Sequence, residues 1–155
     1  MGGQVGRNQI AFHLSPHKTT DNIKLKKAFT VSFANKENVV MADYFGVETG
    51  RNLNKIEKAG AHAIKSKFVD APIIDEFPLT LECKVVEMDM TPYNELRVVG
   101  EVVNMTAKES ILDEKANVDL GKLQPISYDS SSHFYRVLGE PVGKAFSDGL
   151  QIKNK

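Results

Sequence analysis

The sequence predicts a mainly β, antiparallel fold with a few short helices, arranged as a small barrel or sandwich. The middle of the chain carries this prediction. Apolar and polar residues alternate along 77–90, and a second β-rich run at 95–107 follows across the turn-like tetrapeptide TPYN. Two such runs around a short turn are typical of a long antiparallel hairpin. Helical patterns elsewhere in the chain are short.

The elements at the start of the chain are a strand, a helix and a strand. The stretch QIAFHL (9–14) alternates and predicts a strand, and AFTVSFAN (28–35) is rich in β-forming residues and predicts another. Between them, TTDNIKLKKAF predicts a short helix with Thr20 or Asp21 as its N-cap. A polar run therefore joins the first strand to this helix.

Two further helices and a less regular end complete the pattern. Residues 36–46 and 50–60 each predict a short helix ended by a glycine. Residues 108–125 predict a loop with a helical turn, and the segment after them mixes a polar insert with aromatic and glycine residues. There is no repeat, linker or low-complexity tract, so residues 1–155 are expected to form a single domain.

The composition excludes several classes of function. Lys plus Arg equals Asp plus Glu at 20 each, so the formal net charge is zero, which argues against nucleic-acid binding by bulk charge and against a membrane surface as partner. No apolar run reaches the length of a membrane span, and the N-terminus lacks the regions of a signal peptide. A soluble, cytoplasmic protein is expected.

The cysteine and histidine content gives no metal or disulfide framework. Cys83 is the single cysteine of the sequence and falls in the middle of a predicted strand, where a buried structural thiol is expected. No pair among the four histidines has the spacing of a metal-binding motif.

The junction between the first strand and the first helix is a candidate anion site. Helix N-termini carry unpaired N–H groups and partial positive charge, which favour a phosphate. Hydroxyl, ammonium and imidazole groups gather there: Ser15, His17, Lys18, Thr19 and Thr20. A capping loop with an exposed lysine would have the same composition, and helix caps are commoner than anion sites.

Two other stretches are weaker candidates. Arg51 and Lys55 lie four residues apart after Gly50, on one helical face if the helix begins near Arg51. They can bind phosphate or form a solvated basic face. In SSSHFYRVLGEPVGKAF (130–146), His133 and Tyr135 can flank a planar ring or pack as part of an edge segment. No nucleophile–base arrangement occurs, so no catalytic side chain is predicted.

Several stretches together resemble one family. ADYFGVETGRNLNKIEKAG (42–60) is similar to the A-D-Y-F-G-x-x-S-G-R-x-x-x-K-F-x-x-A-G segment of the flavoredoxin group within the flavin reductase-like, FMN-binding split-barrel family. DAPIIDEFPLTLECKV (70–85), GEVV (100–103) and LGEPVGKAFS (138–147) resemble further segments of that group in the same order. Thr49 stands where the family has serine, and Ile56 where an aromatic residue is common.

The resemblance implies a fold, a cofactor and a site. It implies an FMN-binding split β-barrel, expected to lack the first strands of the family, and a homodimer. It places the FMN phosphate on the polar run and on the basic pair, and the residues implied to bind FMN are Ser15, His17, Lys18, Thr19, Thr20, Arg51 and Lys55, with His133 and Tyr135 near the flavin ring.

The resemblance also implies a function, with alternatives. The first expectation is a flavin reductase-like oxidoreductase or electron carrier that moves electrons through bound FMN, with NADH, NADPH or a protein partner as the electron donor. The second is a non-catalytic flavin-binding module. The third is a truncated relic that keeps the barrel and binds flavin weakly.

Overall fold

The computed structural model describes residues 2–153, and the long predicted hairpin is its central feature. The elements in chain order are β1 (Gly2–Gly6), β2 (Gln9–Leu14), α1 (Lys18–Lys26), β3 (Ala28–Phe33), α2 (Val39–Val47), α3 (Lys55–Lys58), β4 (Ala63–Lys65), β5 (Pro72–Ile74), β6 (Leu79–Met90), β7 (Leu96–Ala107), η1 (Glu109–Ile111), α4 (Leu120–Leu123), β8 (Ile126–Asp129), β9 (Phe134–Val137) and α5 (Leu150–Lys153).

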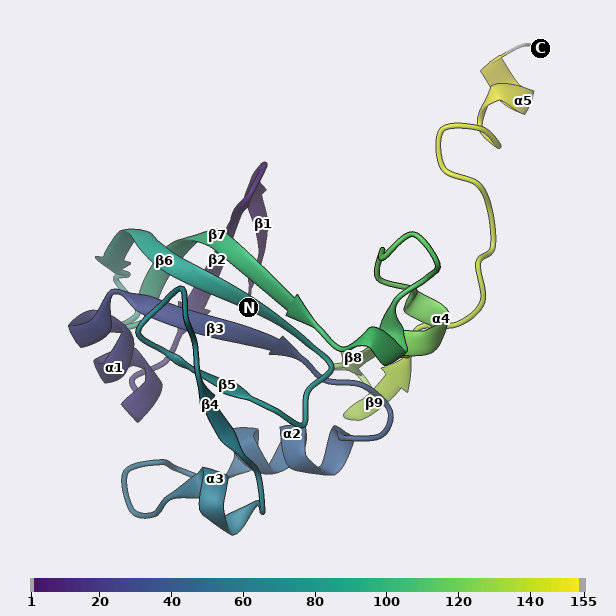
Figure 1. Cartoon of the computed structure of the whole chain (residues 1–155). Helices are drawn as coiled ribbons and strands as arrows, with labels where there is room; N and C mark the ends of the chain where they lie inside the picture. Colours follow the sequence, from purple (N-terminus) through teal and green to yellow (C-terminus); the bar gives the residue numbers. More distant parts are fainter. Residues whose placement is uncertain (1, 154–155) are drawn as a thin grey trace.

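One antiparallel sheet organises these elements (Figure 1). Its strand order is β1-β2-β7-β6-β3, so the hairpin of β6 and β7 lies in the middle, with β2 and β3 on either side. This confirms the mainly β, antiparallel prediction and the hairpin over 77–107. The alternation predicts no strand before Gln9, yet β1 pairs with β2 along the sheet edge, because backbone pairing does not require the alternating side chains that reveal a strand in the sequence.

The hydrophobic core lies where α1 packs against this sheet. Ile23 of α1 joins Phe29, Cys83, Leu96 and other apolar strand residues in one buried cluster. The Cys83 thiol is fully buried, as predicted, and burial raises its pKa to about 11. Gly100 makes this packing close, because a Cβ atom there would lie 2.4 Å from Cζ of Phe29.

The first two polar residues of β6 are also buried, which the alternation did not reveal. Thr80 and Glu82 were predicted to lie opposite the apolar residues, and each is only 1% exposed. The Glu82 carboxylate accepts hydrogen bonds from the Ser66 hydroxyl, from Nδ2 of Asn104 (2.6 Å) and from Oγ1 of Thr106 (2.7 Å). Burial by itself would raise the pKa of Glu82, but these hydrogen bonds hold it below its ordinary value. The loop that carries Ser66 is thereby fixed over the sheet.

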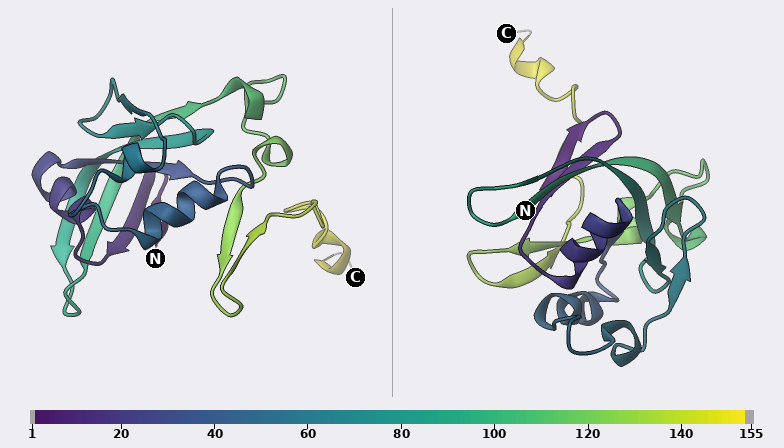
Figure 2. Two further views of the ribbon diagram at one scale, coloured as in Figure 1. Left: turned by 90° about the horizontal axis from the view of Figure 1, so that it is seen from below. Right: turned by 90° about the vertical axis from the view of Figure 1, so that its left-hand side faces the viewer.

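The helices beside the sheet differ from prediction at their ends (Figure 2). The helix predicted over 36–46 was expected to stop at Gly46, but α2 runs through Gly46 to Val47. Glycine tolerates helical angles and ends a helix only when the chain turns there. The second was predicted over 50–60, but α3 spans only Lys55–Lys58, because the Asn54 side chain accepts the N–H of Glu57 (3.4 Å) and starts the helix there.

The chain ends in a separate hairpin and an extended arm. Strands β8 and β9 pair with each other and not with the central sheet, and no hairpin was predicted there. One helical turn was predicted within 108–125, and the structure has two short helical segments there, η1 and α4. After β9, the chain projects away from the sheet towards α5 (Figure 1). No helix among residues 2–153 is long and apolar enough to cross a membrane.

Candidate functional site

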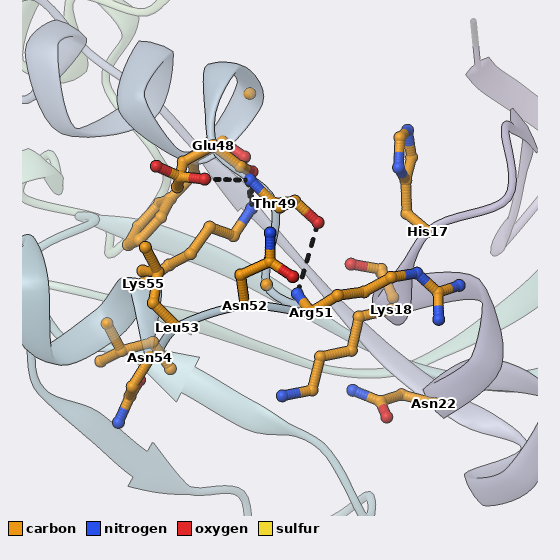
Figure 3. Close-up of a pocket in the computed structure, with 15 residues that line it drawn as sticks. His17, Lys18, Asn22, Glu48, Thr49, Arg51, Asn52, Leu53, Asn54 and Lys55 are labelled. Atoms are coloured by element: carbon orange, nitrogen blue, oxygen red, sulfur yellow. Dashed lines mark hydrogen bonds between the residues drawn. The ribbon is translucent and has the colours of Figure 1, made fainter.

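A cavity of about 840 Å³ lies between the start of α1 and the segment that joins α2 to α3 (Figure 3). Side chains from these two parts of the chain face each other across it. Its lining residues are His17, Lys18, Thr19, Asn22, Phe45, Gly46, Glu48, Thr49, Gly50, Arg51, Asn52, Leu53, Asn54, Lys55 and Ile56. Two polar stretches that are far apart in the sequence therefore form one site.

The α1 side of the cavity is a helix N-terminus. The helix begins at Lys18, and its N-cap is His17, so the predicted cap at Thr20 or Asp21 was wrong. Thr20 still has a capping role from inside the helix: its hydroxyl accepts the N–H of His17 (3.0 Å) and donates to the His17 carbonyl (2.6 Å). The Thr20 side chain is buried. The first turn of α1, to which Thr20 belongs, provides unpaired N–H groups and partial positive charge at this side of the cavity.

The opposite side of the cavity is a loop closed by Lys55. The Lys55 ammonium group donates to the carbonyl oxygens of Phe45 (2.7 Å) and Glu48 (2.8 Å), which belong to the C-terminal end of α2. The Glu48 carboxylate accepts the N–H of Thr49 (2.8 Å), and the Thr49 hydroxyl accepts the N–H of Arg51 (3.3 Å). This network fixes the course of the backbone from α2 to α3.

The basic residues converge on this cavity, although not in the predicted way. Arg51 precedes α3, so it does not share a helical face with Lys55. Instead, the Arg51 guanidinium crosses to α1, where Nη2 lies 2.7 Å from Oδ2 of Asp21. A Cβ atom on Gly50 would lie 3.4 Å from Cδ of Lys18 and 3.6 Å from Cε of Lys55, so both lysine stems run past this glycine.

The remaining predicted site residues lie outside the cavity lining. Ser15 precedes α1 and is exposed. The hairpin of β8 and β9 carries His133 and Tyr135: Nδ1 of His133 is 2.6 Å from the Tyr128 hydroxyl, and the Tyr135 hydroxyl donates to Oδ1 of Asp43 on α2 (2.8 Å). The Asp43 carboxylate raises the pKa of Tyr135. The structure therefore attaches this hairpin to α2 and does not bring these two side chains to Lys18 and Arg51.

Three asparagines of the cavity were missed in the sequence. Asn22 lies one turn into α1, and Asn52 and Asn54 belong to the opposite loop. Amide side chains can donate or accept, so they suit a polar ligand with hydroxyl groups. Their position within the two polar stretches was the available signal, but asparagine is equally common in loops and caps.

A match to a family model identifies the class of protein to which this fold and cavity belong. The family model described as flavin reductase like domain matches residues 9–132, and the chain belongs to this family. The match includes both sides of the cavity.

Individual relatives agree with this assignment. The structure of flavoredoxin of Desulfovibrio vulgaris (Miyazaki F) is similar over 96% of this chain and 80% of its own, with a TM-score of 0.89 and 30% identity. Flavoredoxin from Methanosarcina acetivorans matches 97% of this chain and 81% of its own, with a TM-score of 0.88 and 26% identity. An uncharacterized protein of Aquifex aeolicus (strain VF5) is 32% identical over 79% of this chain. The matched region covers 62% of that relative's own length. The predicted family and its split-barrel fold are confirmed.

Proposed function

We propose that this chain is an FMN-binding flavoprotein, a flavin reductase-like oxidoreductase or electron carrier. The observation that carries the proposal is the convergence of Lys18, Thr19 and Arg51 at the N-terminus of α1. Ammonium, hydroxyl, guanidinium and backbone N–H groups are the donors that bind a phosphate dianion. The residues present therefore fit the phosphate end of FMN. Family membership and flavoredoxin relatives support the same ligand.

The proposed residues have different tasks at the phosphate. Lys18, Thr19 and Arg51 donate to it directly. Thr20 supports the helix end through its cap on His17, and Lys55 holds the loop that carries Arg51, because their polar groups already bond to the backbone. Ser15 lies at the entrance to the helix. FMN would supply the redox chemistry, and the protein would bind it, orient it and set its environment.

A homodimer is the proposed assembly. Apolar side chains on the last hairpin and on the arm are solvent-exposed, among them Phe134 at 65% and Phe146, which is fully exposed. Exposed apolar surface of this kind marks interaction sites. We propose that a second copy covers it and that His133 and Tyr135 approach a flavin ring across the interface. Light scattering of the purified chain tests the assembly, and a monomeric mass at micromolar concentration contradicts it.

Titration with FMN tests the ligand. The expected result is a protein-bound flavin spectrum with FMN and weaker binding of riboflavin, which lacks the phosphate. Arg51→Ala should weaken FMN binding by about 1.5–3 kcal/mol, the value of a hydrogen bond to a charged group. Arg97→Ala is the matched control, because Arg97 also pairs with carboxylates, Glu87 and Asp89, on the central hairpin. An Arg51 variant with unchanged FMN affinity contradicts the assignment.

Electron donors are tested next. In the proposed cytoplasmic setting, NADH or NADPH reduces the bound flavin, and anaerobic mixing with each nicotinamide should bleach its visible absorption. Bound FMN that neither nicotinamide reduces would instead support an electron carrier with a protein donor, or the flavin-binding module.

A further inference from the structure

The ion pair between Asp21 and Arg51 places a carboxylate beside the proposed phosphate site. Oδ2 of Asp21 lies 2.7 Å from Nη2 of Arg51, and the two side chains are 55% and 53% exposed. Asp21 belongs to the first turn of α1, whose N-terminus faces the cavity. A group of the same sign as the ligand is therefore bonded to one of the residues that would hold that ligand.

The balance of charges at the cavity gives the Asp21–Arg51 ion pair a large share in its electrostatics. Three cations, Lys18, Arg51 and Lys55, are opposed by the carboxylates of Glu48 and Asp21. The Lys55 ammonium group is already bonded to two backbone carbonyls. Arg51 is paired with Asp21, so Lys18 is the cation of this site whose ammonium group shows neither an ion pair nor a hydrogen bond among the described residues. Asp21 therefore determines how far the positive charge of Arg51 is available to a bound phosphate.

Asp21 can act on a phosphate in two opposite ways. It can orient the guanidinium, and an exposed ion pair of this kind changes an equilibrium constant by no more than about fivefold. It also repels the ligand: a carboxylate about 6 Å from a dianion in water disfavours binding by roughly tenfold. Salt screening at about 0.1 M reduces that repulsion to about threefold. A guanidinium has five N–H donors and keeps its planar shape without a partner, so at low ionic strength the repulsion exceeds the gain from orientation.

We propose that Asp21 weakens the phosphate site by competing with the bound dianion for Arg51, so that the site releases its ligand more readily than the same cavity would without this carboxylate. The inference rests on the proposed function for the identity of the ligand. It makes Asp21 a determinant of affinity and exchange, whereas Lys18 and Arg51 provide the attraction. The geometry suits a flavin that is exchanged and not held permanently.

Asp21→Asn tests the proposal on the full chain. Both side chains of the pair are half-exposed, so the fold should persist, which circular dichroism verifies. The matched control is Asp70→Asn, because Asp70 pairs with Lys26 at the same 2.7 Å but at the C-terminal end of α1. The probe is inorganic phosphate, followed by the amide chemical shifts of the first turn of α1, and FMN is titrated in parallel.

The expected result is phosphate binding that is about three- to tenfold tighter in Asp21→Asn at low ionic strength, with the gain shrinking as salt is added. Asp70→Asn should stay within about twofold of the parent chain, since its carboxylate is at the other end of the helix. In a double-mutant cycle with Arg51→Ala, the gain should diminish, because the two side chains are in contact.

Unchanged or weaker phosphate binding in Asp21→Asn overturns the proposal, because orientation of Arg51 would then be the dominant effect. Absence of phosphate binding in both chains overturns it as well. If phosphate binds more tightly to the variant but neither chain binds FMN, the competition stands and the proposed flavin function fails. The two conclusions are therefore separable.

Discussion

The buried carboxylate of Glu82 provides a sharp test of how this fold is stabilised. Its Oε1 accepts from Asn104 and Thr106, and its Oε2 accepts from the Ser66 hydroxyl. In Glu82→Gln, one oxygen can keep the first two bonds, but an NH₂ group replaces the oxygen facing Ser66. The Ser66 oxygen already accepts the N–H groups of Phe68 and Val69, both at 3.0 Å, so it has no lone pair left for a further donor.

The magnitude follows from this lost bond. One hydrogen bond to a charged group contributes about 1.5–3 kcal/mol, so Glu82→Gln should lower the free energy of unfolding by about that amount. Guanidinium unfolding followed by far-ultraviolet circular dichroism measures it, at one protein concentration because association changes apparent stability. The matched control is Glu87→Gln on the same strand, which should cost less than about 0.5 kcal/mol, because Glu87 is exposed and its partner Arg97 retains Asp89.

The pH dependence adds a second readout. Because the pKa of Glu82 is lower in the folded protein than its ordinary value of 4.5, the carboxylate stabilises the fold above pH 4.5 and loses this effect as the pH falls through the folded pKa. The difference between the parent chain and Glu82→Gln should therefore narrow below pH 4.5. Equal stability of the two chains at pH 7, or an equal loss in Glu87→Gln, would refute the reasoning.

Three further predictions concern the core and the loop. Gly100→Ala should destabilise the fold by about 1–3 kcal/mol, seen as a lower midpoint of thermal unfolding, because the ring of Phe29 occupies the space of the new methyl group. Cys83, with its pKa near 11 and no exposed surface, should react with a thiol reagent at pH 8 only after unfolding, and fast labelling of the native protein would contradict its burial. Cys83→Ala should bind FMN as the parent chain does. Lys55→Met removes two bonds to backbone carbonyls and should speed amide hydrogen exchange in residues 48–55, whereas unchanged exchange would favour a direct role at the phosphate.

The sequence by itself determined the antiparallel hairpin, the buried Cys83, the polar junction before α1 and the family. The alternation along the first part of β6 and the β-rich run of β7, joined by a short turn, are a strong local signal. A polar run between a strand and a helix is likewise visible without any tertiary information. The family motifs are likewise written in consecutive residues. Each of these features arises from residues that are adjacent in the sequence, so each can be recognised without knowledge of the tertiary structure.

Only the tertiary structure decided how the site is put together. It showed that Lys55 holds a loop, that Arg51 reaches across to Asp21, thirty residues earlier in the chain, and that Glu82 is buried beneath the loop of Ser66. It also attached the last hairpin to α2 through Tyr135 and Asp43. The physical reason is the same in each case: the partner of a charged or hydroxyl group is set by which distant segments pack together, and one residue's local pattern carries no record of that choice.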